Sequence, residues 1–338
     1  MRPSTAAEAP PHVPARPQLK PWYRLVETGE TVVLEHAQAV LVFEGRAARR
    51  LLPSLLALLD GTRTVEEIVA ELGEEAAPGV ENALSLLADK RLLLDGPRLA
   101  AVGPSGMLET VELLASLGAE STPDEIRAAL AEARVSVFGS GEAAPFLATL
   151  LRDSGVGRVD RGGWPDVEAP AGAGAAPFAV VAPARDEVPQ VEAWNRRAVA
   201  EGRPWLQVLP FDGLFAAIGP LYVPGETCCF ECYRLRRRAT SGYADEFGAI
   251  EAAPLAAPAG PALAAAAAGI GALLALRWLA YRDQRLPGVF LALEAAGTAL
   301  SPHRVYRVPR CRACSDVRDV APPLPWHKET RPLAVTAL

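Results

Sequence analysis

The cysteines constrain this chain more than any other feature of its sequence. The segment CCFECYRLRRR at 228–238 contains one Cys-x-x-Cys pair, Cys229 and Cys232, and CRAC near the C-terminus contains a second, Cys311 and Cys314. Two such pairs supply the four thiolates that structural zinc prefers, and a two-residue spacer lets both sulfurs of a pair face one ion. The sequence therefore predicts a zinc site that ties together two distant segments of one domain.

Two other interpretations of the cysteines are a redox pair and unrelated core residues. A redox Cys-x-x-Cys normally occurs once, near the start of a βαβ unit, and unrelated residues would rarely repeat the same spacing. A fifth thiolate has no place in a tetrahedral shell, so we expect Cys228 to pack in the core. Because such a site is closed to substrate, the zinc would hold the fold together and take no part in chemistry.

Length and charge limit the class of protein further. The chain has 338 residues, 50% of them hydrophobic, which is enough for two domains. Its net charge of −6 argues against nucleic acid as a partner. The stretch 262–281 could cross a bilayer by length, but alanine and glycine dominate it and Arg277 lies inside, so we expect a buried helix and no membrane. No apolar run of signal-peptide length opens the sequence, so a cytoplasmic location with reduced thiols is expected.

The first part of the chain predicts a tail followed by a small domain. Residues 1–19 are rich in proline and alanine and are expected to be disordered. Within 20–95, two β-rich segments flank a hairpin signal around Gly29, and AVLVFEG forms a third strand that ends at Gly45. Helical patterns and the short strand RLLLD follow. Three strands, three helices and a closing strand predict a winged-helix domain.

The second part predicts a larger α/β domain. Residues 96–133 hold two helical patterns that form a helical connector or pack on this domain. Within 134–325, a strand, a glycine turn, a helix and a strand open a βαβ pattern, which predicts a parallel, doubly wound sheet with late antiparallel strands. Charged groups such as ARDEVPQ at 184–190 are expected to be solvated loops.

These pieces resemble a known architecture. The segments ARVSVFGSG, GPLYVPGETCCFECYRLR and CRAC are similar to the ThiF-like, Rossmann-type fold of adenylating enzymes, in which two Cys-x-x-Cys pairs hold structural zinc. The preceding LVFEGRAARRLLPSLLALLDGTRTVEEIVAEL resembles the PqqD-like peptide-recognition element of ribosomal-peptide biosynthesis. The resemblance covers residues 20–320.

This combination resembles the leader-peptide-binding proteins of the ocin-ThiF and cyclodehydratase C-protein types. The resemblance implies a non-catalytic subunit that captures the leader region of a precursor peptide. It implies delivery to a separate YcaO-type cyclodehydratase, which would form azolines from Cys, Ser or Thr side chains. Related folds often form dimers, so a homodimer is a further expectation by analogy.

The expected binding mode is β-strand addition, in which the leader pairs with the free edge of the third strand. Its apolar side chains would then lie between that strand and the helix 79–90. The candidate contacts are Val40, Leu41, Val42, Phe43, Ala83, Leu84, Leu87, Lys90 and Arg91. Alternation sends half of the strand residues into the core, and the sequence does not fix which half. The two basic residues would pair with acidic leader residues or form an ordinary solvated helix end.

The nucleotide site of the family is incomplete in this sequence. Active members bind ATP at a turn of the form GxGGxG, where backbone N–H groups meet phosphate. Here the turn at 139–144 is GSGEAA, which keeps Gly139 and Gly141 and places Glu142 near the phosphate position. Active members also carry an Asp-x-Asp pair at the end of the next strand, and here Asp160-Arg161-Gly162 keeps only the first acid. We therefore expect a vestigial nucleotide site and no ATP cofactor.

Two rival functions remain open at this point. The chain could be an enzyme that adenylates the C-terminus of a peptide or carrier protein, which ATP–pyrophosphate exchange would reveal. It could also be a winged-helix regulator that binds DNA. The acidic net charge and the lack of a basic recognition helix argue against DNA binding.

Overall fold

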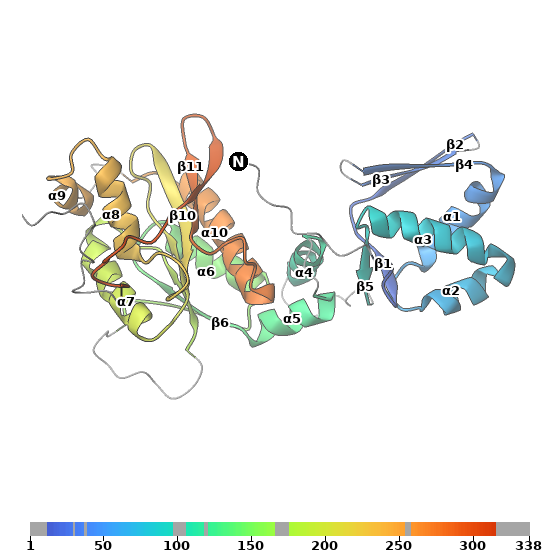
Figure 1. Ribbon diagram of the computed structural model, residues 1–338, viewed down its shortest axis with the longest axis horizontal. Coiled ribbons are helices and arrows are strands. Elements are labelled where there is room, and N and C mark those ends of the chain that lie inside the picture. The colour runs from blue at the N-terminus through green and yellow to red at the C-terminus, as the bar shows by residue number, and fades with distance from the viewer. Residues whose placement is uncertain are drawn as a thin grey trace, which may run out of the picture.

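The computed structural model describes residues 12–29, 31–36, 39–96, 106–117, 121–165, 176–253 and 258–315. Two units follow each other along the chain (Figure 1). The first unit spans residues 12–96 and contains a small three-stranded sheet and helices. The second spans residues 106–315 and contains a seven-stranded sheet with helices on both faces.

The first unit follows the predicted order of elements. Its sheet has the antiparallel order β2-β3-β4, and its helices come next in the chain. The elements are β2 Arg24–Thr28, β3 Thr31–His36, β4 Ala39–Glu44, α1 Arg46–Leu58, α2 Val65–Leu72, η1 Glu74–Ala76 and α3 Ala77–Asp89. A capping box opens α2: Thr64 accepts from the Glu67 N–H, and the Glu67 side chain accepts from the Thr64 N–H. The winged-helix assignment of this arrangement stays a prediction.

Strand alternation builds the core of the first unit. Leu34 of β3 lies opposite Leu41 of β4, and both are buried against the helices. Val42 and its neighbour Val33 lie on the opposite, outer face of the sheet, where Val42 is 55% exposed. The helix α3 contributes its whole apolar face to the same core, with Val80, Ala83, Leu84 and Leu87 buried.

A two-stranded ribbon corrects the expectation that residues 1–19 form a disordered tail. β1 Pro17–Leu19 pairs antiparallel with β5 Leu93–Asp95, and Gln18 and Leu19 are buried. The proline-rich composition suggested disorder, but a three-residue strand needs only one pairing partner and a place in the core. Residues 1–11 of the expected tail lie outside the described residues.

The expected helical connector belongs to the core of the second unit. α4 Met107–Ser116 and α5 Pro123–Glu132 bury Val111, Leu114 and Ile126 in the same hydrophobic cluster as the strands of the large sheet. The two units also touch directly, because the buried Lys20 donates from Nζ to the Ser116 carbonyl at 3.1 Å.

The large sheet is mixed, with the order β12-β11-β10-β9-β8-β6-β7. β6, β7, β8 and β9 are parallel, as predicted for a doubly wound fold, and β11 and β12 are the predicted late antiparallel strands. β10 also runs antiparallel, which the sequence analysis did not predict. The strands are β6 Arg134–Phe138, β7 Arg158–Gly162, β8 Phe178–Val181, β9 Trp205–Val208, β10 Phe215–Tyr222, β11 Val289–Glu294 and β12 Ala299–Arg304.

Helices cover both faces of this sheet (Figure 1). α6 Ala143–Asp153 and α10 Pro261–Tyr281 lie with α5 on one face, whereas α7 Val188–Ala200, α8 Phe230–Thr240 and α9 Phe247–Ala252 lie on the other side. The short helix η2 Arg185–Glu187 leads into α7.

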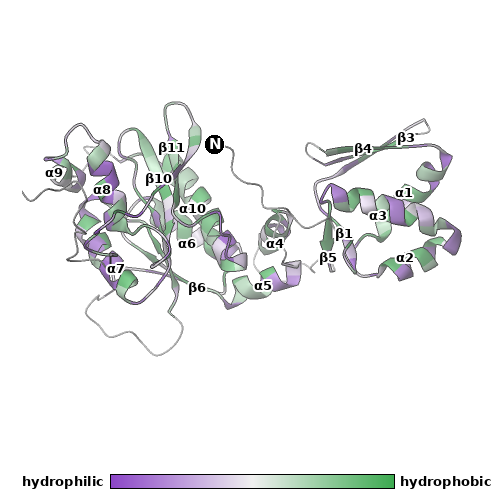
Figure 2. Ribbon diagram, in the orientation of Figure 1, coloured by the Kyte–Doolittle hydropathy of each residue, from purple (hydrophilic) through white to green (hydrophobic). Residues whose placement is uncertain are grey.

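α10 is long and apolar enough to cross a membrane by length and composition, but its contacts are those of a core helix. It packs on α6, α5, β9 and β10, and it is largely hydrophobic in Figure 2. A Cβ at Gly271 would lie 2.7 Å from a Val208 methyl carbon, so glycine lets the helix approach the sheet closely. The predicted buried helix is confirmed.

Candidate functional site

The four cysteines of the two Cys-x-x-Cys pairs come together in the second unit. Their sulfur atoms all lie within 4.8 Å of one another. The Sγ atoms of Cys229 and Cys232 are 3.9 Å apart, those of Cys229 and Cys311 are 3.7 Å apart, and those of Cys232 and Cys314 are 3.5 Å apart. Tetrahedral Zn–S bonds place sulfurs about 3.8 Å apart. The cluster could therefore hold a metal ion such as zinc.

The local structure explains how these thiols are held and why the fifth is excluded. Cys229 is the N-cap residue of α8, and Cys232 lies in the first turn of that helix. Hydrogen bonds from the Cys229 thiol and from the Val308 N–H hold the pKa of Cys232 well below its usual value despite its burial. Burial raises the pKa of Cys228 to about 12, so this thiol stays protonated and packs in the core, as expected.

The glycine-rich turn between β6 and α6 is explained by packing against β8. Gly139 has φ +98°, and a Cβ there would lie 2.4 Å from the Ala182 carbonyl oxygen. A Cβ at Gly141 would lie 2.4 Å from the Pro183 carbonyl oxygen, and the Gly141 N–H donates to Ala182 O at 3.0 Å. Both glycines are therefore required by the neighbouring strand end, whether or not a ligand binds.

A carboxylate of the chain itself binds one N–H group of this turn, that of Ser140. Glu187 accepts hydrogen bonds from the Ser140 N–H at 2.9 Å, the Ala184 N–H at 2.7 Å and the Trp164 indole N–H at 2.9 Å. Burial alone would raise the pKa of Glu187, but these hydrogen bonds outweigh it and hold the pKa below its usual value. The ionised Glu187 side chain is therefore the anion that the Ser140 N–H of the turn binds in this structure.

Sequence analysis missed Glu187, because it lies in the charged group that was expected to be a solvated loop. Its partner Ser140 is distant in the sequence, and no short-range pattern links the two. Trp164, which stacks on Phe138 with ring centroids 6.5 Å apart, was missed for the same reason. Both residues lie at the carboxyl ends of the parallel strands, where ligands bind in open α/β sheets.

Asp160, the acidic residue retained from the nucleotide site of the family, lies within β7. It is paired in register with Ser136, in the middle of β7, whereas Gly162 is the residue level with the end of β6 at Phe138. Its carboxylate is exposed and forms an ion pair with Arg158 at 2.8 Å. β7 therefore continues two residues beyond Asp160, and the assignment of Asp160 to a vestigial nucleotide site stays a prediction.

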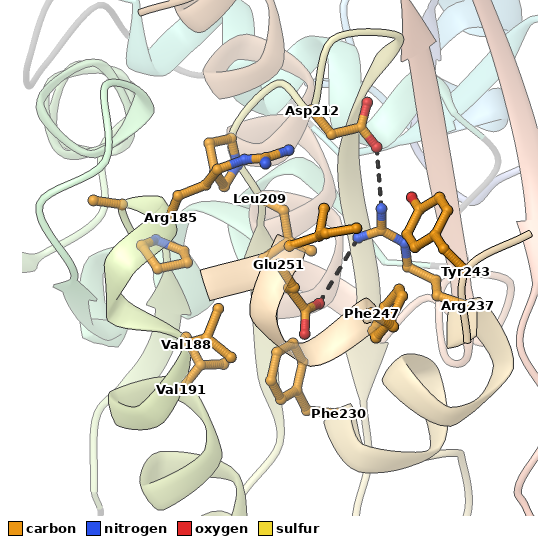
Figure 3. A pocket seen from close by; sticks show the side chains of 14 residues that line it. Arg185, Val188, Val191, Leu209, Asp212, Phe230, Arg237, Tyr243, Phe247 and Glu251 are labelled. Atoms are coloured by element: carbon orange, nitrogen blue, oxygen red, sulfur yellow. Dashed lines mark hydrogen bonds and ion pairs between the residues drawn. The ribbon is translucent and has the colours of Figure 1, made fainter. Parts of the chain in front are cut away.

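A cavity of about 130 Å³ lies between α7, α8 and α9 (Figure 3). Its walls are mostly apolar, and Arg237 crosses one side with its guanidinium 3.1 Å from Asp212 and 4.0 Å from Glu251. Arg234 also pairs with Glu251, at 2.6 Å. These two arginines of the YRLRRR segment are therefore neutralised within the chain and are not free for a docking partner.

The strand residues expected to bind peptide divide cleanly between the two faces of the sheet. Val40 and Val42 are each 55% exposed on the outer face, whereas Leu41 is buried and Phe43 packs against the core. β4 lies at the edge of its sheet, and within the described residues it pairs only with β3. The question that alternation left open is thus answered: the core takes Leu41 and Phe43.

The helix side of the expected groove needs a correction. Ala83, Leu84 and Leu87 are at most 4% exposed and lie inside the core of the first unit. They cannot line an open groove in this conformation, because the i, i+3, i+4 pattern that selected them marks the buried face of any amphipathic helix. Lys90 and Arg91 are exposed just after the end of α3.

Solved structures share this fold. The structure of the heterocyclase TruD superposes with a TM-score of 0.64 and 23% identity over 90% of this chain and 43% of TruD. A heterocyclase in complex with substrate and cofactor gives a TM-score of 0.64 and 24% identity over 89% of this chain and 39% of that chain. E. coli MccB with MccA-N7isoASN gives a TM-score of 0.63 and 14% identity over 88% of this chain and 99% of MccB. No protein-family model and no curated protein matches the sequence.

These likenesses establish the fold of the chain. It is a mixed α/β protein whose central sheet has the Rossmann-like, ThiF-type arrangement. The chain spans less than half the length of the two heterocyclases that it resembles, and nearly the whole of MccB.

Proposed function

We propose that this chain is a non-catalytic scaffold that captures the leader region of a ribosomally made precursor peptide. The first unit serves as a PqqD-like winged-helix recognition domain, and the leader adds as a strand to β4. The chain then delivers the peptide in the cytoplasm to a YcaO-type cyclodehydratase, which forms the azolines. A structural zinc ion bound by the four clustered cysteines holds the second unit together, and a homodimer is compatible with the proposal.

The observation that carries this proposal is the edge of the small sheet. β4 has the sequence AVLVFE and contains no proline, and it exposes Val40 and Val42 beside a backbone edge that pairs with no other strand of the described residues. The edge strands β12, β7 and β2 of the two larger sheets are better protected against pairing. β12 contains Pro302, β7 carries Arg158, Asp160 and Arg161 in five residues, and β2 carries charged residues at both faces.

The fold likenesses support the choice of guest. One heterocyclase of this fold is described in complex with substrate and cofactor, and MccB is described with MccA-N7isoASN. Because this chain spans only 43% of TruD, the proposal assigns the heterocycle-forming chemistry to a partner protein.

Occupation of the glycine-rich turn by Glu187 supports a scaffold without ATP chemistry. A phosphate at the Ser140 N–H would have to displace a carboxylate that accepts three hydrogen bonds. It would also meet Glu142 at the start of α6, and like charges there disfavour binding.

Fluorescence titration with the precursor peptide encoded in the same genetic neighbourhood tests the proposal. We expect saturable binding by the purified chain, and azoline formation by the cyclodehydratase that becomes efficient only when the chain is added. A peptide that does not bind, or an enzyme that works equally well without the chain, would contradict the proposal.

A second candidate function is ATP-dependent adenylation of a peptide or carrier-protein C-terminus. The observation in its favour is that the likeness covers 99% of MccB, which is also described in complex with ATP. ATP–pyrophosphate exchange separates the two functions. Exchange catalysed by this chain alone would establish the enzyme, and we expect none.

A further inference from the structure

An open groove lies on the second unit, between α8 and the ends of β10 and β12. It has a volume of about 650 Å³ and shares Asp212, Arg237, Tyr243 and Phe247 with the smaller cavity of Figure 3. We call it the α8–β12 groove. Its other lining residues are Gly213, Leu214, Phe215, Tyr233, Arg236, Thr240, Ser241, Phe290, Arg304, Val305 and Tyr306.

The charge of the groove is positive, although the chain as a whole is acidic. Arg236 donates to the Arg307 carbonyl and meets no carboxylate, and Arg304 forms no ion pair within the part of the chain that the structure describes. Asp212 is the sole carboxylate among the described lining residues, and it is fully engaged. It binds Arg237 and accepts from the N–H groups of Leu214 and Phe215.

The groove is also apolar and aromatic. Leu214 is 59% exposed and Tyr306 is 68% exposed at its rim, while Phe215 and Phe290 stack with ring centroids 6.4 Å apart. The groove contains arginine, tyrosine and phenylalanine but no lysine among its lining residues. Surfaces that form protein–protein contacts typically have this composition. Exposed apolar side chains gathered around a hollow mark such a contact more strongly than scattered ones.

The backbone at this groove favours recognition through side chains. β12 is an edge strand, but Pro302 lies within it and has no N–H to donate to an added strand. A guest would therefore be held by its carboxylates against the two arginines and by its apolar side chains against the rings, and not by continuous strand pairing.

We propose that the α8–β12 groove binds an acidic segment of the partner protein in which aspartate or glutamate alternates with aromatic or aliphatic residues. This inference rests on the proposed function, because the partner is taken to be the cyclodehydratase that receives the captured peptide. The groove lies on the second unit, whereas the peptide edge lies on the first, so each can be altered without the other.

The first experiment uses the full chain and a fluorescein-labelled peptide of repeated Glu-Phe-Asp-Leu, with repeated Lys-Phe-Lys-Leu as the control peptide. We expect the acidic peptide alone to bind at low salt. The double variant Arg236→Glu, Arg304→Glu should weaken its binding by at least about tenfold, because both cations are reversed. Arg238→Glu is the matched control: Arg238 lies on the same helix and already pairs with Asp245, so a change of less than about twofold is expected.

A second variant protects the test against a folding defect. Leu214→Ser removes an exposed apolar contact without changing the charge of the groove. It should weaken binding of the acidic peptide and leave the melting temperature of the chain unchanged. Equal binding of the acidic peptide by the parent, the double variant and Leu214→Ser would overturn the proposal. Displacement of the peptide by random-sequence duplex DNA would also overturn it, since the groove would then be a nucleic-acid site.

The second experiment separates this inference from the proposed function. Precursor-peptide binding and cyclodehydratase binding are measured on the same double variant. We expect the double variant to bind the precursor peptide as the parent does. We expect it to lose binding of the cyclodehydratase. If both bind as before, the groove is not the docking site and the scaffold function stands. If the parent chain binds no precursor peptide, the scaffold function itself fails.

Discussion

The edge of β4 and the glycine-rich turn after β6 are both places where backbone groups could receive a ligand, but they differ in occupancy. Within the part of the chain that the structure describes, the β4 backbone is paired on one side only, and Val40 and Val42 stand exposed beside it. At the turn, the Ser140 N–H is bound to Glu187 and the Gly141 N–H to Ala182. A glycine-rich motif alone therefore does not make a binding site, because a backbone group that already has a hydrogen-bond partner within the chain gains little free energy from binding a ligand.

The largest expected effect comes from the cysteine cluster. Cys232→Ala removes one of the four thiols, and we expect the free energy of unfolding of the second unit to fall by more than about 4 kcal/mol. Elemental analysis should show loss of about one zinc per chain, while the first unit and its peptide edge stay folded. Cys228→Ala is the matched control, because this residue is equally buried and lies outside the cluster. An unchanged, metal-free wild-type protein would contradict the zinc site.

The next effect distinguishes a core residue from a groove residue. Leu84→Asp places a charge in the core of the first unit, where Leu84 is 1% exposed, and should destabilise that unit by about 4 kcal/mol. Calorimetry should show the transition of the first unit lowered and that of the second unchanged. Peptide capture would be lost together with folding. A Leu84→Asp chain that folds normally but fails to bind peptide would show that α3 lines the peptide groove after all.

A smaller effect tests which edge of the small sheet binds peptide. Val42→Asp on β4 should weaken precursor binding by about tenfold, since a charge would replace an apolar contact beside the guest strand. Val26→Asp is the matched control: Val26 is 48% exposed on the same face and belongs to the opposite edge strand β2. Fluorescence titration should show at most about a twofold change for the control. Equal losses in both variants would place the peptide on the face of the sheet.

The smallest effect concerns Glu187 and has a defined pH dependence. Glu187→Gln should lower the free energy of unfolding at pH 7 by about 1–2 kcal/mol, because charged hydrogen bonds are replaced by neutral ones. The folded pKa of Glu187 is held below its usual value of 4.5, so its stabilisation is fully present above that value. The stabilisation is lost as the pH falls through the folded pKa. Denaturant titrations should therefore show the gap between parent and variant shrinking below pH 4.5. A gap that persists in acid would assign the effect to packing.

Local patterns in the sequence predicted much of the fold. The hairpin between β2 and β3 and the βαβ opening at β6 follow from spacings of a few residues. The two Cys-x-x-Cys pairs predicted a cluster across a long separation in the sequence, because two such pairs commonly supply the four thiolates of a structural zinc site.

The remaining features depend on contacts that no local pattern encodes. Glu187 meets Ser140 only after β6 and β8 pair, and Gly139 is required by the distant Ala182 carbonyl. The apolar stripe of α3 could not reveal whether it faces a groove or the core, since both need the same periodicity. β1 was missed because its burial comes from pairing with β5, far along the chain.

Backbone hydrogen exchange with and without saturating precursor peptide tests the central claim most directly. If the precursor peptide adds to the β4 edge, we expect slowed exchange at the β4 amides, residues 39–44. We expect no change at β12, residues 299–304, or at the turn 139–144. Unchanged exchange at β4 in a fully formed complex, or slowing at the glycine-rich turn instead, would contradict it.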